Sequence, residues 1–127
     1  MTFTYAEGGA LLERYVAART GYHGDDWVAL FAPEGELRLD PFADPLVGHN
    51  ALRAYLNEAA EAETNYELTI ERHWVAGDSL LAAWHASWAP EGSGASTHVA
   101  GFLAAETRDG AIVRLRQWWN AREPLAG

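Results

Sequence analysis

The spacing of hydrophobic residues changes along the chain and predicts the order of its helices and strands. Over residues 6–20, apolar side chains recur with the roughly 3.6-residue period of an amphipathic helix. Gly21 provides a C-terminal stop for this helix. Asp25 and Asp26 then open a short second helix, because acidic residues are favoured at the positively polarised start of a helix.

After Gly35 the hydrophobic period falls to two, which is typical of a strand, and Asp40-Pro41 ends that strand. A third helix is expected over about 48–62, capped by the side chain of Asn50. Four longer strands follow, separated by turn residues, at 66–76, 79–89, 96–107 and 111–121.

This order of elements predicts an α+β domain. We expect a cone-shaped, curved antiparallel sheet whose concave face is covered by the three helices. The sequence contains no internal repeat, low-complexity segment or linker, so residues 1–127 are expected to form one domain with its core over about 6–121. Three helices of this length cover such a face incompletely, and the remaining space is the expected ligand pocket.

Composition narrows the chemistry. The chain carries a formal net charge of −9, with nine basic residues against eighteen acidic ones, and such a surface disfavours binding to nucleic acid or to a membrane. Lysine and cysteine do not occur in the sequence, which excludes Schiff-base lysines, thiolate nucleophiles and disulfides. We see neither a signal peptide nor an apolar run of about 20 residues, so a cytoplasmic location is expected.

The last predicted strand has two mixed faces, and neither is purely polar. Alternation divides its side chains into one set of Val113, Leu115, Gln117 and Trp119, and another of Ile112, Arg114, Arg116, Trp118 and Asn120. Both faces are therefore expected to meet something other than bulk water. One can line an interior pocket, and the other can form a subunit contact or lie under a helix.

Three segments resemble a known family: LFAPEGELRLD from Leu30, DPLVGHNALRAYL from Asp44, and DGAIVRLRQWWN from Asp109. In their sequence and order they resemble the SnoaL-like branch of the nuclear transport factor 2-like superfamily. The resemblance implies the same cone-shaped fold, and it implies a homodimer that pairs through the convex side of the sheet. This fold hosts enzymes, carriers and assembly domains, so the resemblance does not choose among them.

Within that superfamily, the nearest catalytic template is limonene-epoxide hydrolase. Its essential last-strand aspartate falls on Gln117, and its water-holding tyrosine and asparagine fall on Arg38 and Asp40. Its middle-strand arginine and aspartate fall on His85 and Ser87. None of the five positions keeps the template's residue, and glutamine cannot accept a proton from water, so epoxide hydrolysis by that mechanism is not expected. Ketosteroid isomerases and polyketide cyclases resemble the chain in fold alone.

Asp40 and His85 are the candidate catalytic residues, because the template implies that both face the pocket. A histidine can titrate near neutral pH, and a carboxylate across the pocket can hold its tautomer. Two alternatives stay open. Arg38 can pair with Asp40, which would weaken Asp40 as a base and leave Arg38 as a binder of substrate oxygen. His85 can instead be a core or interface histidine.

The remaining candidates are assigned to substrate binding. Arg38 and Gln117 would hold polar atoms of the ligand, and Trp119 would stack on its rings. The pocket would also be lined by Ser87, Tyr15 and Phe42. No local spacing typical of a metal site occurs, and neither a metal nor a cofactor is expected.

Trp84 and Trp88 are four residues apart, which places them on one face of a strand, opposite His85 and Ser87. Together with Arg116 and Trp118 they are predicted to form an aromatic and arginine-rich homodimer surface. The alternative is that these tryptophans cover the sheet beneath a helix.

These observations predict a protein that binds a small hydrophobic or polycyclic molecule bearing a carbonyl or hydroxyl group. It would be an enzyme if it also transferred protons in an isomerisation, cyclisation or dehydration. A non-catalytic carrier or sensor with the same pocket is the first alternative. A dimerisation module whose cavity is filled by its own side chains is the second.

Overall fold

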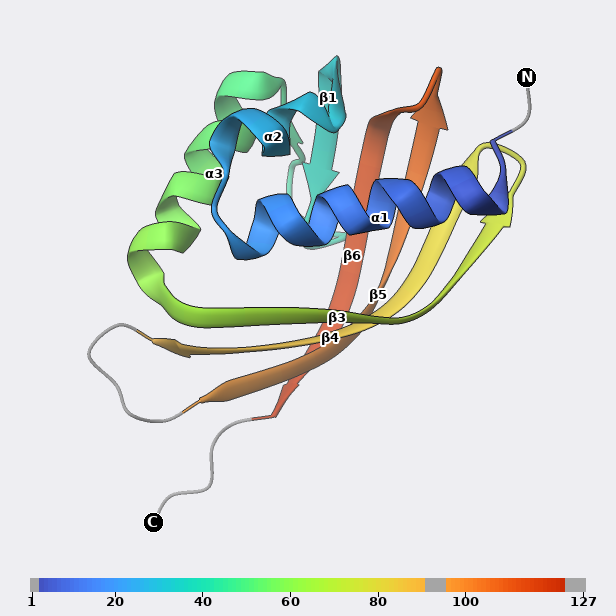
Figure 1. Ribbon diagram of the computed structural model, residues 1–127. Coiled ribbons are helices and arrows are strands. Elements are labelled where there is room, and N and C mark those ends of the chain that lie inside the picture. Colours follow the sequence, from blue (N-terminus) through green and yellow to red (C-terminus); the bar gives the residue numbers. More distant parts are fainter. Residues whose placement is uncertain (1–2, 91–95, 123–127) are drawn as a thin grey trace.

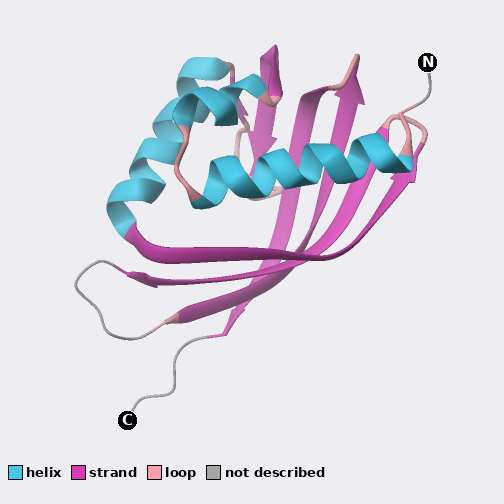
Figure 2. Ribbon diagram, viewed as in Figure 1, coloured by secondary structure: helices cyan, strands magenta, loops and turns pink. Residues whose placement is uncertain are grey.

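Three helices lie against the inner face of one curved sheet (Figures 1 and 2). The structure, a computed structural model, describes residues 3–90 and 96–122. The helices are α1 (Tyr5–Thr20), α2 (Gly24–Ala29) and α3 (His49–Ala62). None of the helices in these described ranges is long and apolar enough to cross a membrane.

The sheet has six strands in the order β2-β1-β6-β5-β4-β3. The strands are β1 (Phe31–Arg38), β2 (Leu46–Val47), β3 (Glu63–Ala76), β4 (Ser79–Pro90), β5 (Thr97–Arg108) and β6 (Ala111–Arg122). Strands β3 to β6 form the predicted antiparallel meander. Because β1 runs parallel to β6, the sheet is mixed rather than purely antiparallel. The α+β class and the cone-shaped architecture are confirmed.

Both ends of α1 are fixed by local hydrogen bonds, which matters because this helix carries much of the site described below. At its start, the Thr4 side chain accepts from the Glu7 N–H and the Glu7 carboxylate accepts from the Thr4 N–H. This reciprocal capping satisfies two donors that the helix itself cannot. At its end, Gly21 is the C-cap, as predicted.

The start of α3 differs from the prediction. Its N-cap is Gly48, with φ at +88° and no side-chain cap, so the assignment of Asn50 as the cap was wrong. A positive φ is readily adopted by glycine, which has no Cβ. The turn at Gly48 follows the two-residue strand β2, which alternation could not reveal because so short a strand has no period.

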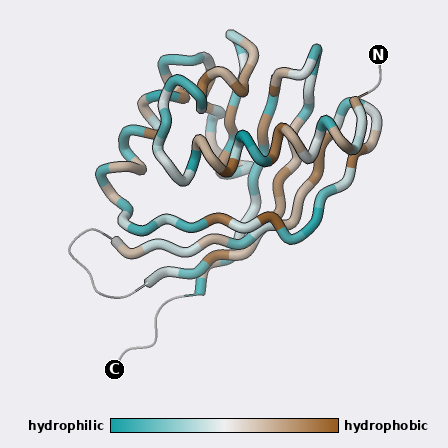
Figure 3. The backbone as a smooth tube through the Cα atoms, in the orientation of Figure 1, coloured by the Kyte–Doolittle hydropathy of each residue, from teal (hydrophilic) through white to brown (hydrophobic). Residues whose placement is uncertain are grey.

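The core lies between the helices and the inner face of the sheet. Trp27 of α2 is buried there, and its indole N–H donates to the backbone oxygen of Leu52 on α3 at 3.0 Å. Figure 3 shows brown hydrophobic segments on the helices and on the strands of the sheet that they cover. The largest fully buried aliphatic side chains are Leu30, Leu37, Leu52, Leu56, Leu80, Leu103 and Leu115.

An irregularity in β6 changes which of its residues face the core. Ile112 and Leu115 are both buried, although simple alternation puts them on opposite faces. The register between β5 and β6 shifts at Glu106 and Thr107, and this bulge reverses the alternation locally. The prediction that Ile112 shares a face with Arg114, Arg116 and Trp118 was therefore wrong. Gln117 keeps the inward direction predicted for it, two residues beyond Leu115.

Candidate functional site

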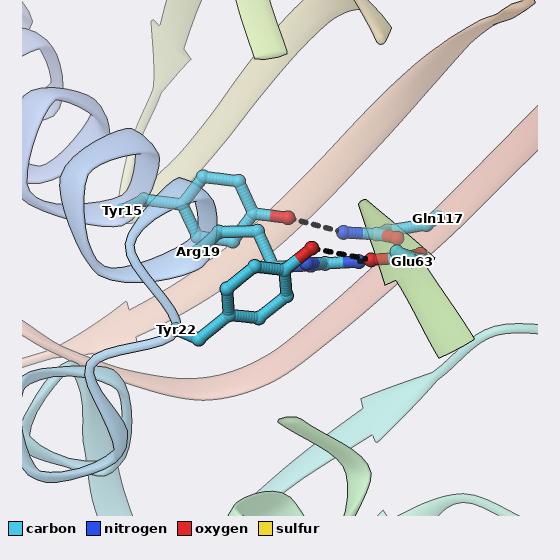
Figure 4. A network of polar contacts seen from close by, with 5 residues as sticks. All are labelled: Tyr15, Arg19, Tyr22, Glu63 and Gln117. Atoms are coloured by element: carbon cyan, nitrogen blue, oxygen red, sulfur yellow. Dashed lines mark hydrogen bonds and ion pairs between the residues drawn. The ribbon is translucent and has the colours of Figure 1, made fainter. Parts of the chain in front are cut away.

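A hydrogen bond inside the cone joins α1 to β6. The side-chain amide of Gln117 donates to the Tyr15 hydroxyl at 2.5 Å (Figure 4). Tyr15 is buried, and burial, followed by the proximity of Tyr66 and Tyr55, raises its pKa far above the ordinary tyrosine value. The phenol is therefore neutral. Because it accepts from Gln117, its own proton remains available for donation to another group.

One turn further along α1, Arg19 forms a buried ion pair with Glu63 at the start of β3. Arg19 is only 5 % exposed, and its Nη2 lies 3.1 Å and 3.2 Å from the two carboxylate oxygens. The Tyr22 hydroxyl donates to the same carboxylate at 3.2 Å (Figure 4). Arg19 Nη1 is buried as well and meets no acceptor within the described part of the chain.

Three tyrosine rings surround the Arg19 guanidinium. Its carbon lies 3.9 Å from the centre of the Tyr66 ring, 5.7 Å from that of Tyr22 and 5.9 Å from that of Tyr55. Burial raises the pKa of Tyr66 to about 12, against the opposing effect of Arg19. Burial alone would lower the pKa of Arg19, but the nearby tyrosines and Glu63 raise it. The guanidinium therefore stays charged in an aromatic box.

Aromatic side chains cover the inner face of the sheet beside these polar groups. Trp84 is buried, and its ring lies 6.5 Å from that of Trp119. The Trp88 ring stacks on Tyr66 at 5.8 Å. The assignment of Trp84 and Trp88 to an outer subunit surface was therefore wrong, and their alternative position under the helices is the observed one.

Gly101 explains how two tryptophans fit side by side on this face. It lies on β5 between Trp84 of β4 and Trp119 of β6 in the strand register. A Cβ added to Gly101 would come within 2.9 Å of both tryptophan side chains and 2.2 Å of the Trp118 backbone oxygen. The missing side chain at this position thus provides the space that the two indoles occupy.

A groove of about 760 Å³ runs along β6 where this strand continues past the end of β1. Asp40, Gln117 and Trp119 line it, so the structure brings three of the predicted site residues together. Trp119 is 41 % exposed there. The other lining residues are Leu39, Pro41, Ala100, Gly101, Phe102, Trp118 and Asn120.

His85 and Ser87 do not face this groove. The residues between and around them, Trp84 and Ala86, are buried in the core, so His85 and Ser87 point to the outer face. The His85 side chain is half exposed, with Nε2 3.8 Å from a Glu71 carboxylate oxygen. The inward direction predicted for them was wrong, because small and apolar residues occupy both faces of β4 and conceal which one is buried.

The catalytic pair predicted from the sequence is not assembled. Strands β6 and β5 lie between β1 and β4, so about 14 Å of sheet, or three strand spacings, separates Asp40 from His85. Asp40 instead accepts a hydrogen bond from the Phe42 backbone at 2.8 Å. Phe42 itself is 97 % exposed and forms no wall of the groove.

Arg38 also departs from its predicted position. It is paired in register with Arg116, and its neighbour Leu37 is the buried residue. Arg38 therefore lies on the outer face, where its guanidinium donates to the Ala43 backbone oxygen at 2.7 Å. The inward orientation expected from the template was wrong for this residue.

The Arg19 box was not predicted from the sequence. Tyr15 and Arg19 are four residues apart, which places them on one face of a helix, and that signal was available. Glu63 lies 44 residues from Arg19, and no local pattern links two such distant positions.

The sequence model of the SnoaL-like domain matches residues 12–115. The chain belongs to this family. The match begins within α1 and ends within β6, so it includes Tyr15 and the Arg19 box and stops two residues before Gln117. The wider nuclear transport factor 2-like superfamily is confirmed with it. Among functionally curated proteins, none matches the sequence.

Solved structures share the fold of this SnoaL-like protein at low sequence identity. A candidate SnoaL-like polyketide cyclase from Jannaschia superposes with a TM-score of 0.80 at 17 % identity, over 91 % of this chain and 86 % of the other. An LEH-like epoxide hydrolase from M. tuberculosis gives 0.77 at 15 %, over 91 % and 84 %. A protein of ketosteroid isomerase-like fold from Catenulispora acidiphila, in complex with trimethylamine, gives 0.79 at 18 %, over 85 % and 83 %.

Proposed function

We propose that this SnoaL-like protein binds a small hydrophobic or polycyclic molecule bearing a carbonyl or hydroxyl group. The observation that carries the proposal is Trp119, a large aromatic side chain on the inner face that remains 41 % exposed in a groove shared with Gln117 and Asp40. An indole in this position offers a ring surface on which a flat ligand stacks.

The polar group of the ligand would be held beside the Tyr15–Gln117 pair. The Tyr15 hydroxyl keeps a proton to donate, and Gln117 both lines the groove and fixes the phenol. A carbonyl or hydroxyl oxygen brought into such a site needs a partner, because an unpaired buried polar group costs on the order of 1–3 kcal/mol. A ligand of this class satisfies both requirements of the groove, ring contact and one hydrogen bond.

A second function, proton transfer, is favoured by one observation. The Asp40 carboxylate lines the same groove as Trp119 and Gln117, where it is placed to take a proton from a carbon beside a ligand carbonyl. His85 has no part in this version, because it lies on the outer face. Asp40→Asn would abolish turnover and retain affinity, and His85→Gln would change neither. A non-catalytic carrier would show no turnover as wild type or as either variant.

The solved structures of similar fold are consistent with the binding of a small molecule. They include a candidate polyketide cyclase, an epoxide hydrolase and a protein in complex with trimethylamine. Because their sequence identity to this chain is low, they support a small molecule as the ligand class without specifying which compound binds.

We also propose that the chain forms a homodimer through an outer aromatic patch made of Trp74, Phe102 and Trp118. The Trp74 and Phe102 rings lie 6.0 Å apart, and Phe102 and Trp118 are exposed. Arg116 lies 5.4 Å from the Trp118 ring. Clustered aromatic residues with arginine are typical of the centre of protein interfaces, and this patch takes the place predicted for Trp84 and Trp88.

Native mass spectrometry of the purified protein, beside the same sample denatured, tests both proposals. We expect a dimer that carries a small ring compound, released on denaturation. If the purified protein is empty, titration with 2-acetylnaphthalene, a two-ring ketone, should show saturable binding. An empty protein that also fails to bind this probe would contradict the ligand-binding proposal, and a monomer would contradict the dimer.

A further inference from the structure

Three arginines line a second cavity, the arginine pocket, which has a volume of about 330 Å³. One of them, Arg114, is held by two carboxylates: its Nε lies 2.8 Å from Glu36 Oε1, and its Nη1 lies 3.4 Å from Glu106 Oε2. The other two, Arg38 and Arg116, form no ion pair in the part of the chain that the structure describes. Two guanidinium groups of this pocket therefore lack a counter-ion from the described residues.

Arg38 and Arg116 lie next to each other. They are the final pair in the register between β1 and β6, and neighbouring strands lie about 4.8 Å apart. Arg38 donates to the Ala43 backbone oxygen at 2.7 Å, and Nε of Arg116 is buried and meets no acceptor in the described residues. Like charges at this separation repel each other, and an anion between them would turn repulsion into attraction.

The charges at the arginine pocket indicate that a group with a single negative charge fits. Arg38, Arg114 and Arg116 line the pocket, and Glu36 and Glu106 pair with Arg114, which leaves one net positive charge. A carboxylate neutralises it, whereas a phosphate monoester carries a charge of about −1.5 to −2 and would add an excess anion near the two glutamates. The planar guanidinium group also matches a planar carboxylate in geometry.

The arginine pocket adjoins the groove at the free edge of β6. Both cavities are lined by Pro41, Gln117 and Trp118. Beyond Arg116, β6 has no partner on its β1 side in the described sheet, so a flexible arm can pass round this edge from the inner to the outer face. A ring on Trp119 and an acidic group in the arginine pocket can therefore belong to one molecule.

We propose that Arg38 and Arg116 bind a carboxylate carried by the ligand of the groove. This inference rests on the proposed function and narrows its ligand class to ring compounds with a flexible acidic arm. Trp119 holds the ring, and the two arginines select the charge of the arm. The proposed dimer is compatible with this site, because two charged groups that a partner shields from water need a counter-ion all the more.

Two probes of the same length test the inference by isothermal titration calorimetry at constant ionic strength. They are 4-(2-naphthyl)butanoate, which has an anionic arm, and 4-(2-naphthyl)butanamide, whose arm is neutral. We expect the wild-type protein to bind the acid at least about tenfold more tightly than the amide, since hydrogen bonds to charged groups are the stronger ones. Arg116→Gln should lose most of this preference.

Arg72→Gln is the matched control for Arg116→Gln. The Arg72 guanidinium lies 5.0 Å from the ring of Trp74, much as that of Arg116 lies 5.4 Å from the ring of Trp118. Arg72 does not line the arginine pocket, so Arg72→Gln removes the same charge from the protein and should keep the preference for the acid.

Arg116→Glu should reverse the preference, because it places a negative charge in the pocket. We expect this variant to bind 4-(2-naphthyl)butylamine, a cation at neutral pH, at least about tenfold more tightly than wild type does. Misfolding cannot produce such a gain. Sedimentation velocity of Arg116→Gln shows whether a carboxylate of a second copy fills the pocket instead: a variant that dissociates relative to wild type would assign the arginines to the subunit contact and overturn the inference.

2-Acetylnaphthalene, which has no acidic arm, separates the two proposals. If this ketone binds while the acid and the amide bind equally, the inference is overturned and the proposed function stands. The inference is also overturned if Arg116→Gln keeps the preference for the acid, or if Arg72→Gln loses it to the same extent. Failure of every naphthyl probe to bind overturns the proposed function, and the inference with it.

Discussion

Gln117 and Tyr15, 102 positions apart in the chain, meet inside the cone through a hydrogen bond of 2.5 Å from the amide to the phenol. The contact fixes α1 over β6 and sets the direction of both side chains. It also leaves the phenol proton free, because the hydroxyl acts as acceptor in this bond. Tyr15 therefore holds α1 against β6 and also keeps an O–H that can donate to a ligand.

The Tyr15–Gln117 bond should appear as a coupling in stability. Gln117→Leu leaves the buried Tyr15 phenol without its partner and should lower the free energy of unfolding by about 1–3 kcal/mol. Tyr15→Phe takes the acceptor from a half-buried Gln117 amide that water can still reach, so its cost should lie at the lower end of that range. The double variant should lose less than the sum by about 1 kcal/mol. Urea unfolding of the four proteins measures this, and strict additivity would show that the two groups do not interact.

Trp119 lines the groove and Trp74 does not, so Trp74 is the matched control for a substitution of Trp119. Trp119→Ala should weaken binding of 2-acetylnaphthalene by about tenfold or more, because it removes the ring surface in the groove. Trp74→Ala removes an equal indole from the outer patch and should leave that affinity within about twofold. Calorimetric titration compares them, and equal losses would argue against a ligand site on the inner face.

The fold should lose stability in alkaline solution. Burial raises the pKa of Tyr66 to about 12 and also raises the pKa values of Tyr15 and Tyr55. Below about pH 10 these tyrosines are protonated in both the folded and the unfolded chain, and the stability is complete. Between pH 10 and 12 Tyr66 ionises in the unfolded chain while it stays largely protonated in the folded chain, so the free energy of unfolding falls, by about 2 kcal/mol at pH 12 from Tyr66 alone.

Urea unfolding at a series of pH values from 8 to 11.5 measures this loss. Tyr66→Phe should show a shallower fall above pH 10, because phenylalanine has no proton to lose. An identical slope in wild type and Tyr66→Phe would show that the Tyr66 phenol is not held in the buried environment seen here.

The dimer should depend on the outer aromatic patch. Phe102→Ser places a polar side chain at its centre and should convert the protein to a monomer at micromolar concentration. Phe42→Ser is the control, since it makes the same change at a fully exposed loop residue that is not a member of the patch. Sedimentation velocity distinguishes the two states. A dimer that survives Phe102→Ser, or one that Phe42→Ser dissociates, would contradict this interface.

The order of helices and strands was predictable because each period extends over many residues. The two faces of β6 are both mixed, so the inward direction of Gln117 and Trp119 was predictable from the family resemblance and not from alternation alone. The same inference failed on β4, where Trp84 and His85 are flanked by alanine and serine and either face fits the pattern. Which face of β4 is buried depends on where the helices pack on the sheet, and that is a tertiary contact that the local sequence does not encode.

The candidate site was only partly accessible to sequence reasoning. Asp40 and Gln117 lie in the groove, but Asp40 and His85 were paired on a template whose residues this chain does not keep. The Arg19–Glu63 pair joins the end of α1 to the start of β3, and such a contact exists only after the chain has folded. A buried arginine gives no signal of its burial in the sequence, because arginine is ordinarily exposed.

The central claim, that the inner face of the cone is the ligand site, is tested most directly by the indole N–H signals of the six tryptophans in a ¹⁵N-labelled sample titrated with 2-acetylnaphthalene. Single Trp→Phe substitutions assign the signals. The account predicts saturable shifts of the inner-face indoles, Trp119, Trp84 and Trp88, with Trp74, which lies outside the groove, unchanged. Shifts confined to Trp74 and Trp118 would place binding on the outer face and contradict it.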